Sequence, residues 1–291
     1  MKFSCILCKG QEFFQISKKT RDSKIEVVQC NSCSHIQLYP LPSKQEEERF
    51  YNQDVQTRSL RRKFSVKDLE KISLPDTQRR IRLISESASR GKTLLDIGTG
   101  YGFFLKAAKE AGFNPTGLEV GTDRLKVAKT ITKVPIWNSR IAGKNTKRKK
   151  FDLITLFHVL EHVEDPIKLC QDLSTYLNKK GSLIIEVPNT DHYLNRVFKE
   201  YQDFYWQRAH LSYFTPTILR EVLKEAGFRK IKLVGIQRYS FINSINWIIF
   251  KKPQLKNPSY ETKAFALIDY IYKKILKSNL KCDTLWIEAK V

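Results

Sequence analysis

The chain has 291 residues, of which 41% are hydrophobic, and this fits a large globular domain with room for a small additional unit. Its 52 lysines and arginines against 30 acidic residues give a net charge of +22, which would attract anionic partners, although lysines spread over solvated faces are the simpler explanation. No run approaches the roughly 18 apolar residues of a membrane-spanning helix, and the first residues lack the apolar core of a secretory signal. We therefore expect a cytoplasmic, globular protein rather than a disordered or membrane-spanning one.

Four of the six cysteines form two Cys-x-x-Cys pairs near the N-terminus, Cys5 with Cys8 and Cys30 with Cys33. This is nearly the spacing of a zinc ribbon, in which four thiolates hold a structural Zn²⁺ in a closed tetrahedral site. Alternating segments at 13–16 and 25–28 predict a hairpin between the pairs, and prolines at 40 and 42 end the unit. We expect a zinc-ribbon-like module at residues 1–42. A redox dithiol, which normally uses one such pair, is the alternative.

Residues 43–90 are polar, with helical patterns at 45–51 and 77–87, and are expected to form a linker with a helical cap. From residue 91 onward, apolar runs alternate with amphipathic helical patterns, which is typical of a doubly wound parallel sheet. Strands are expected at 93–97, 115–119, 151–157, 182–187, 231–234 and 284–289. Asp165 and Thr215, each followed by proline, predict two helix starts.

The turn after the first of these strands contains Gly98, Gly100 and Gly102. Glycine permits a sharp turn and close approach of a ligand, and the helix N-terminus behind it offers free N–H groups. Glu119 ends the next strand, where an acid can accept hydrogen bonds from both hydroxyls of a ribose. A dinucleotide fingerprint would need glycine at the position of Phe103, so the spacing disfavours that cofactor.

With Asp96 two residues ahead of it, this loop resembles motif I of class I S-adenosylmethionine-dependent methyltransferases. Further segments resemble O-methyltransferases of the ubiquinone-biosynthesis type, namely Phe151–Val163, Gly181–Asn189, His210–Thr215 and Asp283–Ala289. The resemblance implies an α/β fold with a seven-stranded, doubly wound, Rossmann-like sheet over residues 91–291. It also implies that Asp96 and the loop, including Thr99, hold the amino acid end of S-adenosylmethionine.

Two further cofactor contacts follow from the same resemblance. Many relatives carry an acid after the third strand that contacts the adenine amino group, but the matching stretch 136–140 has none. Asn138 is the remaining side-chain candidate for that contact. Phe157 ends a central strand, at the edge where open α/β sheets bind their ligands.

His158 and His210 are the candidate general bases, because a histidine near neutral pKa can take the proton of a hydroxyl acceptor. A buried structural histidine is the alternative at both positions. His158-x-x-Glu161-His162 also spells an inverted zinc-protease signature, which requires both histidines on one helical face and a third ligand.

The stretch 237–281 is longer than a turn requires, and lysines surround apolar residues at helical spacing. Such a basic amphipathic insert can lie on an anionic membrane, pack on the core or join two subunits. We expect methyl transfer, at oxygen, to a small-molecule, sugar or lipid-linked acceptor. The alternative is an RNA-directed methyltransferase or nucleic-acid-binding protein. It is disfavoured because Thr155–His158 does not resemble the Asn/Asp-Pro-Pro-Tyr/Phe segment of amino-directed nucleic-acid enzymes.

Overall fold

The computed structural model describes residues 4–52, 64–89, 91–139, 149–252 and 263–291. Parts of the predicted linker (53–63) and of the predicted insert (253–262) lie outside these residues. The chain forms two compact units. The first comprises Met1–Leu41, His158–Cys170 and Ile185–Ala289, and the second comprises Pro42–Phe157, Gln171–Ile184 and Lys290–Val291.

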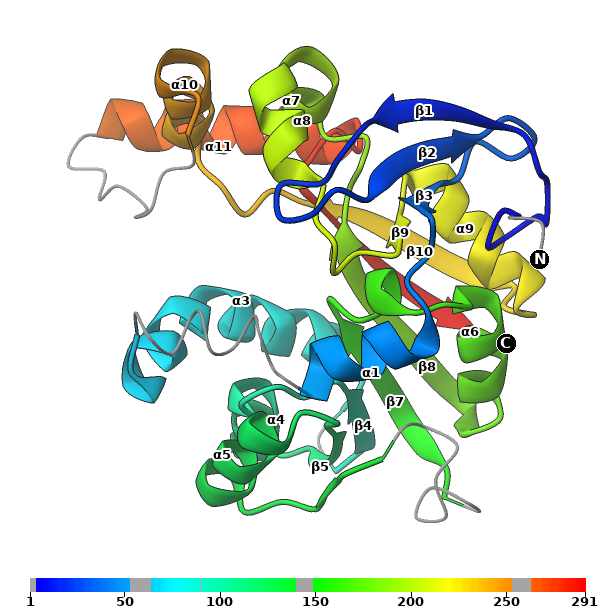
Figure 1. Cartoon of the computed structure of the whole chain (residues 1–291). Helices are drawn as coiled ribbons and strands as arrows, with labels where there is room; N and C mark the ends of the chain where they lie inside the picture. Colours follow the sequence, from blue (N-terminus) through cyan, green and yellow to red (C-terminus); the bar gives the residue numbers. More distant parts are fainter. Residues whose placement is uncertain (1–3, 53–63, 90, 140–148, 253–262) are drawn as a thin grey trace. The chain divides into compact units, whose positions relative to one another are not determined.

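Seven strands are hydrogen-bonded in the order β10-β11-β8-β7-β4-β5-β6, which confirms the predicted α/β class (Figure 1). Their bounds are β4 Thr93–Ile97, β5 Asn114–Leu118, β6 Ile136–Trp137, β7 Phe151–Phe157, β8 Leu177–Pro188, β10 Lys230–Ile236 and β11 Thr284–Lys290. The predicted strand at 151–157 matches β7 at both ends. β8 is longer than predicted and begins five residues before the predicted start at 182.

Strands β4 and β7 lie at the centre of the second unit and are mostly apolar and buried, as expected for parallel strands covered on both sides. Asp152 fixes their relative position by polar bonds. Its Oδ2 accepts hydrogen bonds from the backbone N and Oγ1 of Thr93, both at 2.9 Å, and its Oδ1 accepts one from Nδ2 of Asn178. One carboxylate therefore links β7 to β4 and β8.

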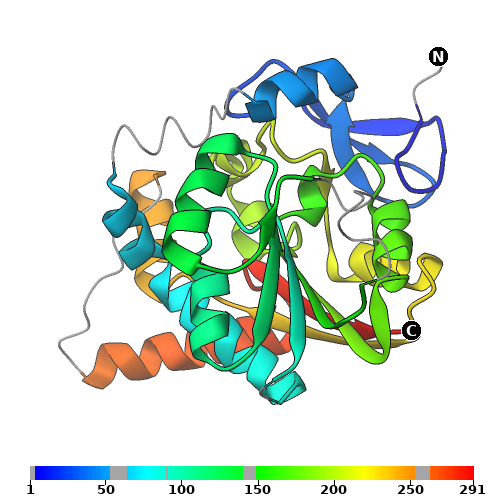
Figure 2. The ribbon, with the colours of Figure 1, turned by 90° about the horizontal axis from the view of Figure 1, so that it is seen from below.

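The helices of the second unit are α1 Lys44–Asn52, α3 Val66–Ser87, α4 Phe103–Glu110 and α5 Thr122–Thr132. Helices α3, α4 and α5 lie side by side along one flank of the strands (Figure 2). The predicted start of α3 at residue 77 is wrong, because Ser65 and Asp68 form a capping box that begins the helix eleven residues earlier. The helix continues past Pro75, whose ring ordinarily interrupts a helix.

The first unit contains a four-stranded sheet in the order β1-β2-β3-β9. The predicted hairpin is present as β1 Phe13–Ser17 and β2 Glu26–Cys30. The sequence did not indicate β3 Ile36–Tyr39, nor its antiparallel pairing with β9 Ser212–Tyr213, which comes from a distant part of the chain. The module is therefore built into this unit through a shared sheet.

The remaining helices include the 3₁₀ turn η1 Leu160–His162, α6 Pro166–Ser174, α7 Tyr193–Val197, α8 Lys199–Tyr205, α9 Pro216–Glu225, α10 Phe241–Phe250 and α11 Lys263–Ser278. Thr215 caps α9 as predicted, since its Oγ1 accepts a hydrogen bond from the backbone N of Ile218. None of the helices within the described ranges combines the length and apolarity that crossing a bilayer requires.

Candidate functional site

Four of the predicted cofactor-contacting residues each come directly after a residue that is paired across the neighbouring strands β7, β4, β5 and β6. Ile97 is paired with Leu118 on β5 and with Leu156 on β7, and Leu118 is paired with Trp137 on β6. Parallel strands end at the same edge of a sheet, so the next residue of each strand lies at that edge. These residues are Gly98, Glu119, Asn138 and Phe157.

The glycine loop adopts a backbone that favours glycine at all three of its glycine positions. Gly98, Gly100 and Gly102 have φ angles of 69°, 60° and 82°, in the left-handed region that other residues seldom adopt. Beside Gly100 the space is open, with no atom within 4 Å of where a Cβ would stand. A Cβ on Gly102 would instead lie 2.6 Å from Thr132, so that glycine also permits close packing against α5.

The carboxylate of Glu119 is tied to this loop. It is buried, and its Oε2 accepts a hydrogen bond from the backbone N of Gly100 at 2.7 Å. Its Oε1 accepts another from the backbone N of Gly121 at 2.7 Å and lies 3.4 Å from a guanidinium nitrogen of Arg124. A carboxylate offers about four lone-pair sites, so Glu119 can keep these bonds and still accept hydrogen bonds from ligand hydroxyls.

Asp96 is buried under the same loop. Its Oδ2 accepts a hydrogen bond from Oγ1 of Thr99 and its Oδ1 accepts one from Oγ1 of Thr155, both at 2.7 Å. Burial raises the pKa of the Asp96 carboxyl to about 6, although the two threonine hydroxyls oppose the effect. The carboxylate is therefore costly to ionise until a cationic group approaches it.

The other two of the four residues at this edge differ in environment. Asn138 is exposed directly after β6, and Phe157 is half-buried. The Phe157 ring meets the ring of Phe104 edge-on at 4.8 Å, and the guanidinium of Arg80 lies 4.5 Å from its centroid. Phe157 is therefore held between α3 and α4, whereas the side chain of Asn138 projects into solvent.

In the first unit, His158 lies between two buried carboxylates. Its Nδ1 lies 3.2 Å from Oε1 of Glu161, and its Nε2 lies 3.2 Å from Oε1 of Glu186. Burial on its own would lower the pKa of His158, but the two carboxylates outweigh it and raise the pKa. Its φ of 56° is unusual for a residue other than glycine and indicates local backbone strain.

His162 and His210 form a second part of this cluster, with ring centroids 5.0 Å apart. Nδ1 of His162 donates a hydrogen bond to the carbonyl oxygen of Ala209 at 2.5 Å, so in the neutral form of the ring the lone pair lies on Nε2. Nδ1 of His210 accepts a hydrogen bond from Nε2 of Gln207 at 3.3 Å, so its proton is on Nε2. Burial, together with His162, lowers the pKa of His210 to about 3 and keeps it neutral.

The structure therefore brings the predicted residues His158 and His210 into one cluster through Glu161. Against the effect of burial, the hydrogen bond with His158 and the nearby histidines lower the pKa of Glu161 to about 2. Glu161, His162 and His210 each offer a ligand atom, and these atoms lie within 4.8 Å of one another, close enough to hold a metal ion. No role for Glu186 was predicted from the sequence. The signal that could have identified Glu186 is an acidic residue within an otherwise apolar, buried strand.

The zinc-protease alternative does not fit this geometry. His162 ends a 3₁₀ turn and His158 precedes it with a left-handed backbone, so the two do not share the face of an α-helix. Both ring nitrogens of His158 face carboxylates, which leaves neither directed toward a shared ion with His162.

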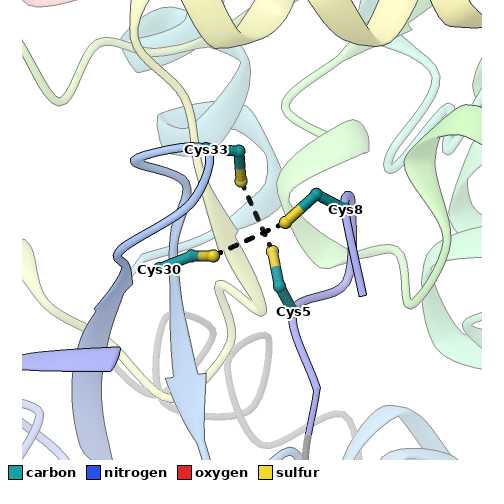
Figure 3. A group of neighbouring side chains, drawn as sticks. All are labelled: Cys5, Cys8, Cys30 and Cys33. Atoms are coloured by element: carbon teal, nitrogen blue, oxygen red, sulfur yellow. Dashed lines mark hydrogen bonds between the residues drawn. The ribbon is translucent and has the colours of Figure 1, made fainter. Parts of the chain in front are cut away.

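The four N-terminal cysteines meet at one point (Figure 3). Sγ of Cys5 lies 3.6 Å from Sγ of Cys33, and Sγ of Cys8 lies 3.5 Å from Sγ of Cys30. These separations are too long for disulfides, whose S–S bond is about 2.05 Å. They are close to the edge of a tetrahedron with Zn–S bonds of about 2.3 Å. The donor set and its spacing fit a structural zinc ion.

The two cysteine pairs have the same backbone turn. Cys5 N bonds to Gly10 O and Lys9 N to Cys5 O, while Cys30 N bonds to His35 O and Ser34 N to Cys30 O. Such paired turns aim both thiols of each pair inward. Against the effect of burial, hydrogen bonds from the backbone of Cys33 and Ser32 lower the pKa of Cys30 to about 7, which favours the thiolate at that position. Burial raises the pKa of Cys5 and Cys33, so their thiolates would depend on the metal itself.

The cysteine module contacts the segment that carries His210. Gln37 pairs with Ser212, and Nε2 of His35 lies 3.2 Å from Oγ of Ser212. Nη2 of Arg21 donates to Oε1 of Gln207 at 2.8 Å, and the same amide donates to His210. A chain of hydrogen bonds thus runs from the module to the His210 ring.

Comparison with known proteins agrees with this geometry. The family model described as "Methyltransferase domain" matches residues 70–233, more than half of the chain. The chain belongs to this methyltransferase family. The resemblance in its glycine loop and later strands is thereby confirmed at the level of family.

A ubiquinone biosynthesis O-methyltransferase of Haemophilus ducreyi is 31% identical over 121 residues, which cover 38% of this chain and 49% of that relative. The chain thus spans about half the length of this relative. Among solved structures, a SAM-dependent methyltransferase from Archaeoglobus fulgidus is similar with a TM-score of 0.53, 21% identity and coverage of 73% and 92%. The plantazolicin methyltransferase BpumL in complex with SAH has a TM-score of 0.53, 16% identity and coverage of 84% and 93%. These two likenesses confirm the fold.

Proposed function

We propose that the protein transfers a methyl group from S-adenosylmethionine. The observation that carries the proposal is the buried Glu119 carboxylate bonded to the left-handed glycine loop at the carboxyl ends of β4 and β5. In this assignment Glu119 accepts hydrogen bonds from the ribose hydroxyls. Asp96, Gly98, Thr99, Gly100 and Gly102 surround the amino acid end, and Asn138 and Phe157 border the adenine and the reacting group.

When bound, S-adenosylmethionine supplies an electrophilic methyl group, and an acceptor oxygen displaces its sulfonium sulfur as the new C–O bond forms. The histidine–carboxylate cluster is proposed to hold the acceptor and remove its proton. Nε2 of His162 carries a lone pair and is the group suited to take that proton. The carboxylates of Glu161 and Glu186 raise the pKa of His158, which when protonated balances their charge. Nε2–H of His210 can donate to the acceptor.

Oxygen is the proposed target, supported by the cluster chemistry and by relatives named O-methyltransferases. The acceptor is proposed to be a small molecule, a sugar or a lipid-linked molecule, and a lipid-linked acceptor would bring the protein into peripheral contact with a membrane. If a divalent cation occupies Glu161, His162 and His210, it would lower the pKa of a coordinated hydroxyl. Activity measured with and without a chelator, at a chelator concentration that leaves the zinc content of the four-cysteine module unchanged, separates these two ways of deprotonating the acceptor.

We also propose that Cys5, Cys8, Cys30 and Cys33 bind a structural Zn²⁺. Four thiolates close the coordination shell and leave no open position for chemistry. The metal would supply folding energy to the module, whose sheet is small.

Calorimetric titration with S-adenosylhomocysteine tests the core proposal. Wild-type protein should bind it, whereas Glu119→Gln should lose roughly one to two orders of magnitude in affinity, since a hydrogen bond to a charged group is worth about 1.5–3 kcal/mol. Glu110→Gln, at an exposed position on α4, is the matched control and should bind like wild type. No binding by the metal-replete wild type would overturn the proposal.

A nucleic-acid acceptor is the second candidate, favoured by one surface feature of the second unit. A hollow of about 490 Å³ at the amino ends of β4, β5 and β7 is lined by several lysines, namely Lys109, Lys133, Lys149 and Lys150. Binding to RNA with a steep dependence on salt would favour this candidate. Salt-independent or absent binding would leave the small-molecule or lipid-linked acceptor.

A further inference from the structure

Helices α10 and α11 of the first unit (labelled in Figure 1) both carry many exposed, large apolar side chains. On α10 they occupy the last turn, and on α11 they recur along most of its length: Ile248, Ile249, Phe250, Phe265, Leu267, Ile268, Tyr270, Ile271 and Ile275. A concentration of this kind on a globular protein usually marks a surface that another body covers. We call these nine side chains the apolar face.

Polar groups attach α11 to the rest of the unit. Oδ1 of Asp269 accepts a hydrogen bond from the backbone N of Phe241 at 2.8 Å. The Tyr272 hydroxyl lies 2.6 Å from Oγ of Ser244 and 3.2 Å from the hydroxyl of Tyr193. An amphipathic helix that served only to extend the core would turn its apolar residues inward. Here many of them point outward, so packing on the protein's own core does not account for the helix.

The charge around the apolar face is strongly positive. Asp269 is the single acidic residue of α10 and α11, and it is buried and paired with Lys273 at 2.9 Å. Lys252, Lys274 and Lys277 are exposed beside the apolar residues. Two copies of a chain with net charge +22 would repel each other through such lysine-rich surfaces, whereas an anionic surface would attract them.

We infer that the apolar face binds an anionic lipid membrane, with the apolar side chains at the acyl boundary and the lysines at the headgroups. Apolar burial and attraction to anionic lipid act together in such interfacial helices. Binding at this surface needs neither cofactor nor acceptor, so its failure and a failure of the proposed methyl transfer are distinguishable.

Flotation of the full-length protein with two vesicle compositions tests the inference. Vesicles of phosphatidylcholine mixed with phosphatidylglycerol should carry the wild type upward, and added salt should weaken this binding. Vesicles of phosphatidylcholine alone should bind it less. Leu267→Glu/Ile271→Glu changes two residues of the apolar face, which are 59% and 47% exposed, and should reduce binding at least roughly tenfold.

Ile72→Glu/Leu74→Glu on α3 is the matched control, because these side chains are 60% and 47% exposed but lie in the other unit. It should bind vesicles like wild type, and both variants should bind S-adenosylhomocysteine normally. Equal flotation of the two variants would overturn the inference. It would also be overturned if light scattering showed a wild-type dimer that Leu267→Glu/Ile271→Glu converts to monomer while no form floats.

Discussion

Replacing Asp96 by asparagine should stabilise the ligand-free protein at neutral pH, although the residue lies at the centre of the proposed cofactor site. The carboxyl is buried, its two oxygens accept hydrogen bonds from Thr99 and Thr155, and burial raises its pKa to about 6. Keeping it ionised in the folded protein therefore costs free energy that an uncharged amide of the same shape avoids.

The magnitude follows from the pKa. A rise from 3.8 to about 6 corresponds to about 3 kcal/mol at neutral pH, since each tenfold change in proton affinity is worth about 1.4 kcal/mol. The NH₂ group of the introduced asparagine cannot accept a hydrogen bond from one of the two threonine hydroxyls. The loss of that bond lowers the stability gain by about 1 kcal/mol. The expected net gain at neutral pH is about 2 kcal/mol.

The sign depends on pH. The pKa of the Asp96 carboxyl is higher in the folded protein than in the unfolded chain. Between about pH 4 and about pH 6 the folded protein therefore holds a proton that the unfolded chain has released, and the wild type loses stability as pH rises through this range. The asparagine variant has no such loss. The advantage of Asp96→Asn should therefore grow between acidic and neutral pH.

Urea denaturation of both proteins at about pH 5 and about pH 7.5 measures this difference. Asp152→Asn is the contrasting control, because hydrogen bonds outweigh burial there and lower the pKa of the Asp152 carboxyl. Its effect should be destabilising at neutral pH and smaller in acid. A difference between wild type and Asp96→Asn that does not change with pH would refute the reasoning, whatever its sign.

Three further outcomes are expected. Cys8→Ser should lower the zinc content measured by plasma mass spectrometry and the melting temperature, whereas Cys170→Ser should keep the zinc, because that thiol is buried on α6 away from the cluster. Glu161→Gln should lower kcat by roughly 10²–10⁴-fold without weakening S-adenosylhomocysteine binding, and a normal kcat would exclude the cluster from catalysis. Arg21→Met should lower kcat roughly tenfold, as expected for one charge-assisted bond of about 1.5 kcal/mol, with KM unchanged. An unchanged kcat would remove Arg21 from any positioning role.

The parts that the sequence predicted well are those fixed by local patterns. Strand β7 is a largely apolar run that is buried along most of its length, and its bounds match the prediction. The glycine loop and Glu119 follow strands β4 and β5, whose parallel register aligns their carboxyl ends. Their proximity could therefore be predicted from their positions at the ends of two strands. The seven-stranded sheet and the methyltransferase family are confirmed, while the individual roles of the cofactor-site residues stay predictions.

The parts that escaped prediction depend on contacts between distant residues. Strand β9 has two residues and no strand pattern of its own, and it becomes a strand because β3 pairs with it. The left-handed backbone of His158 and its second carboxylate, Glu186, arise from the fold and not from neighbouring residues. The outward apolar side chains of α11 likewise contradict the usual reading of an amphipathic pattern.

These distant contacts suggest why a cysteine module is joined to this enzyme fold. A two-residue strand cannot hold the Ala209–Ser212 segment in place without a partner, and a single hairpin would be marginal as that partner. Clamping by the proposed zinc would make the hairpin rigid. Trp206 and Tyr213 pack with Val27 and Leu38, and this packing joins the cysteine module to the Ala209–Ser212 segment. The Ala209 carbonyl, which sets the tautomer of His162, lies on this segment. In the proposed mechanism the module would therefore act on the acceptor chemistry through position, and its metal would lie outside the reaction.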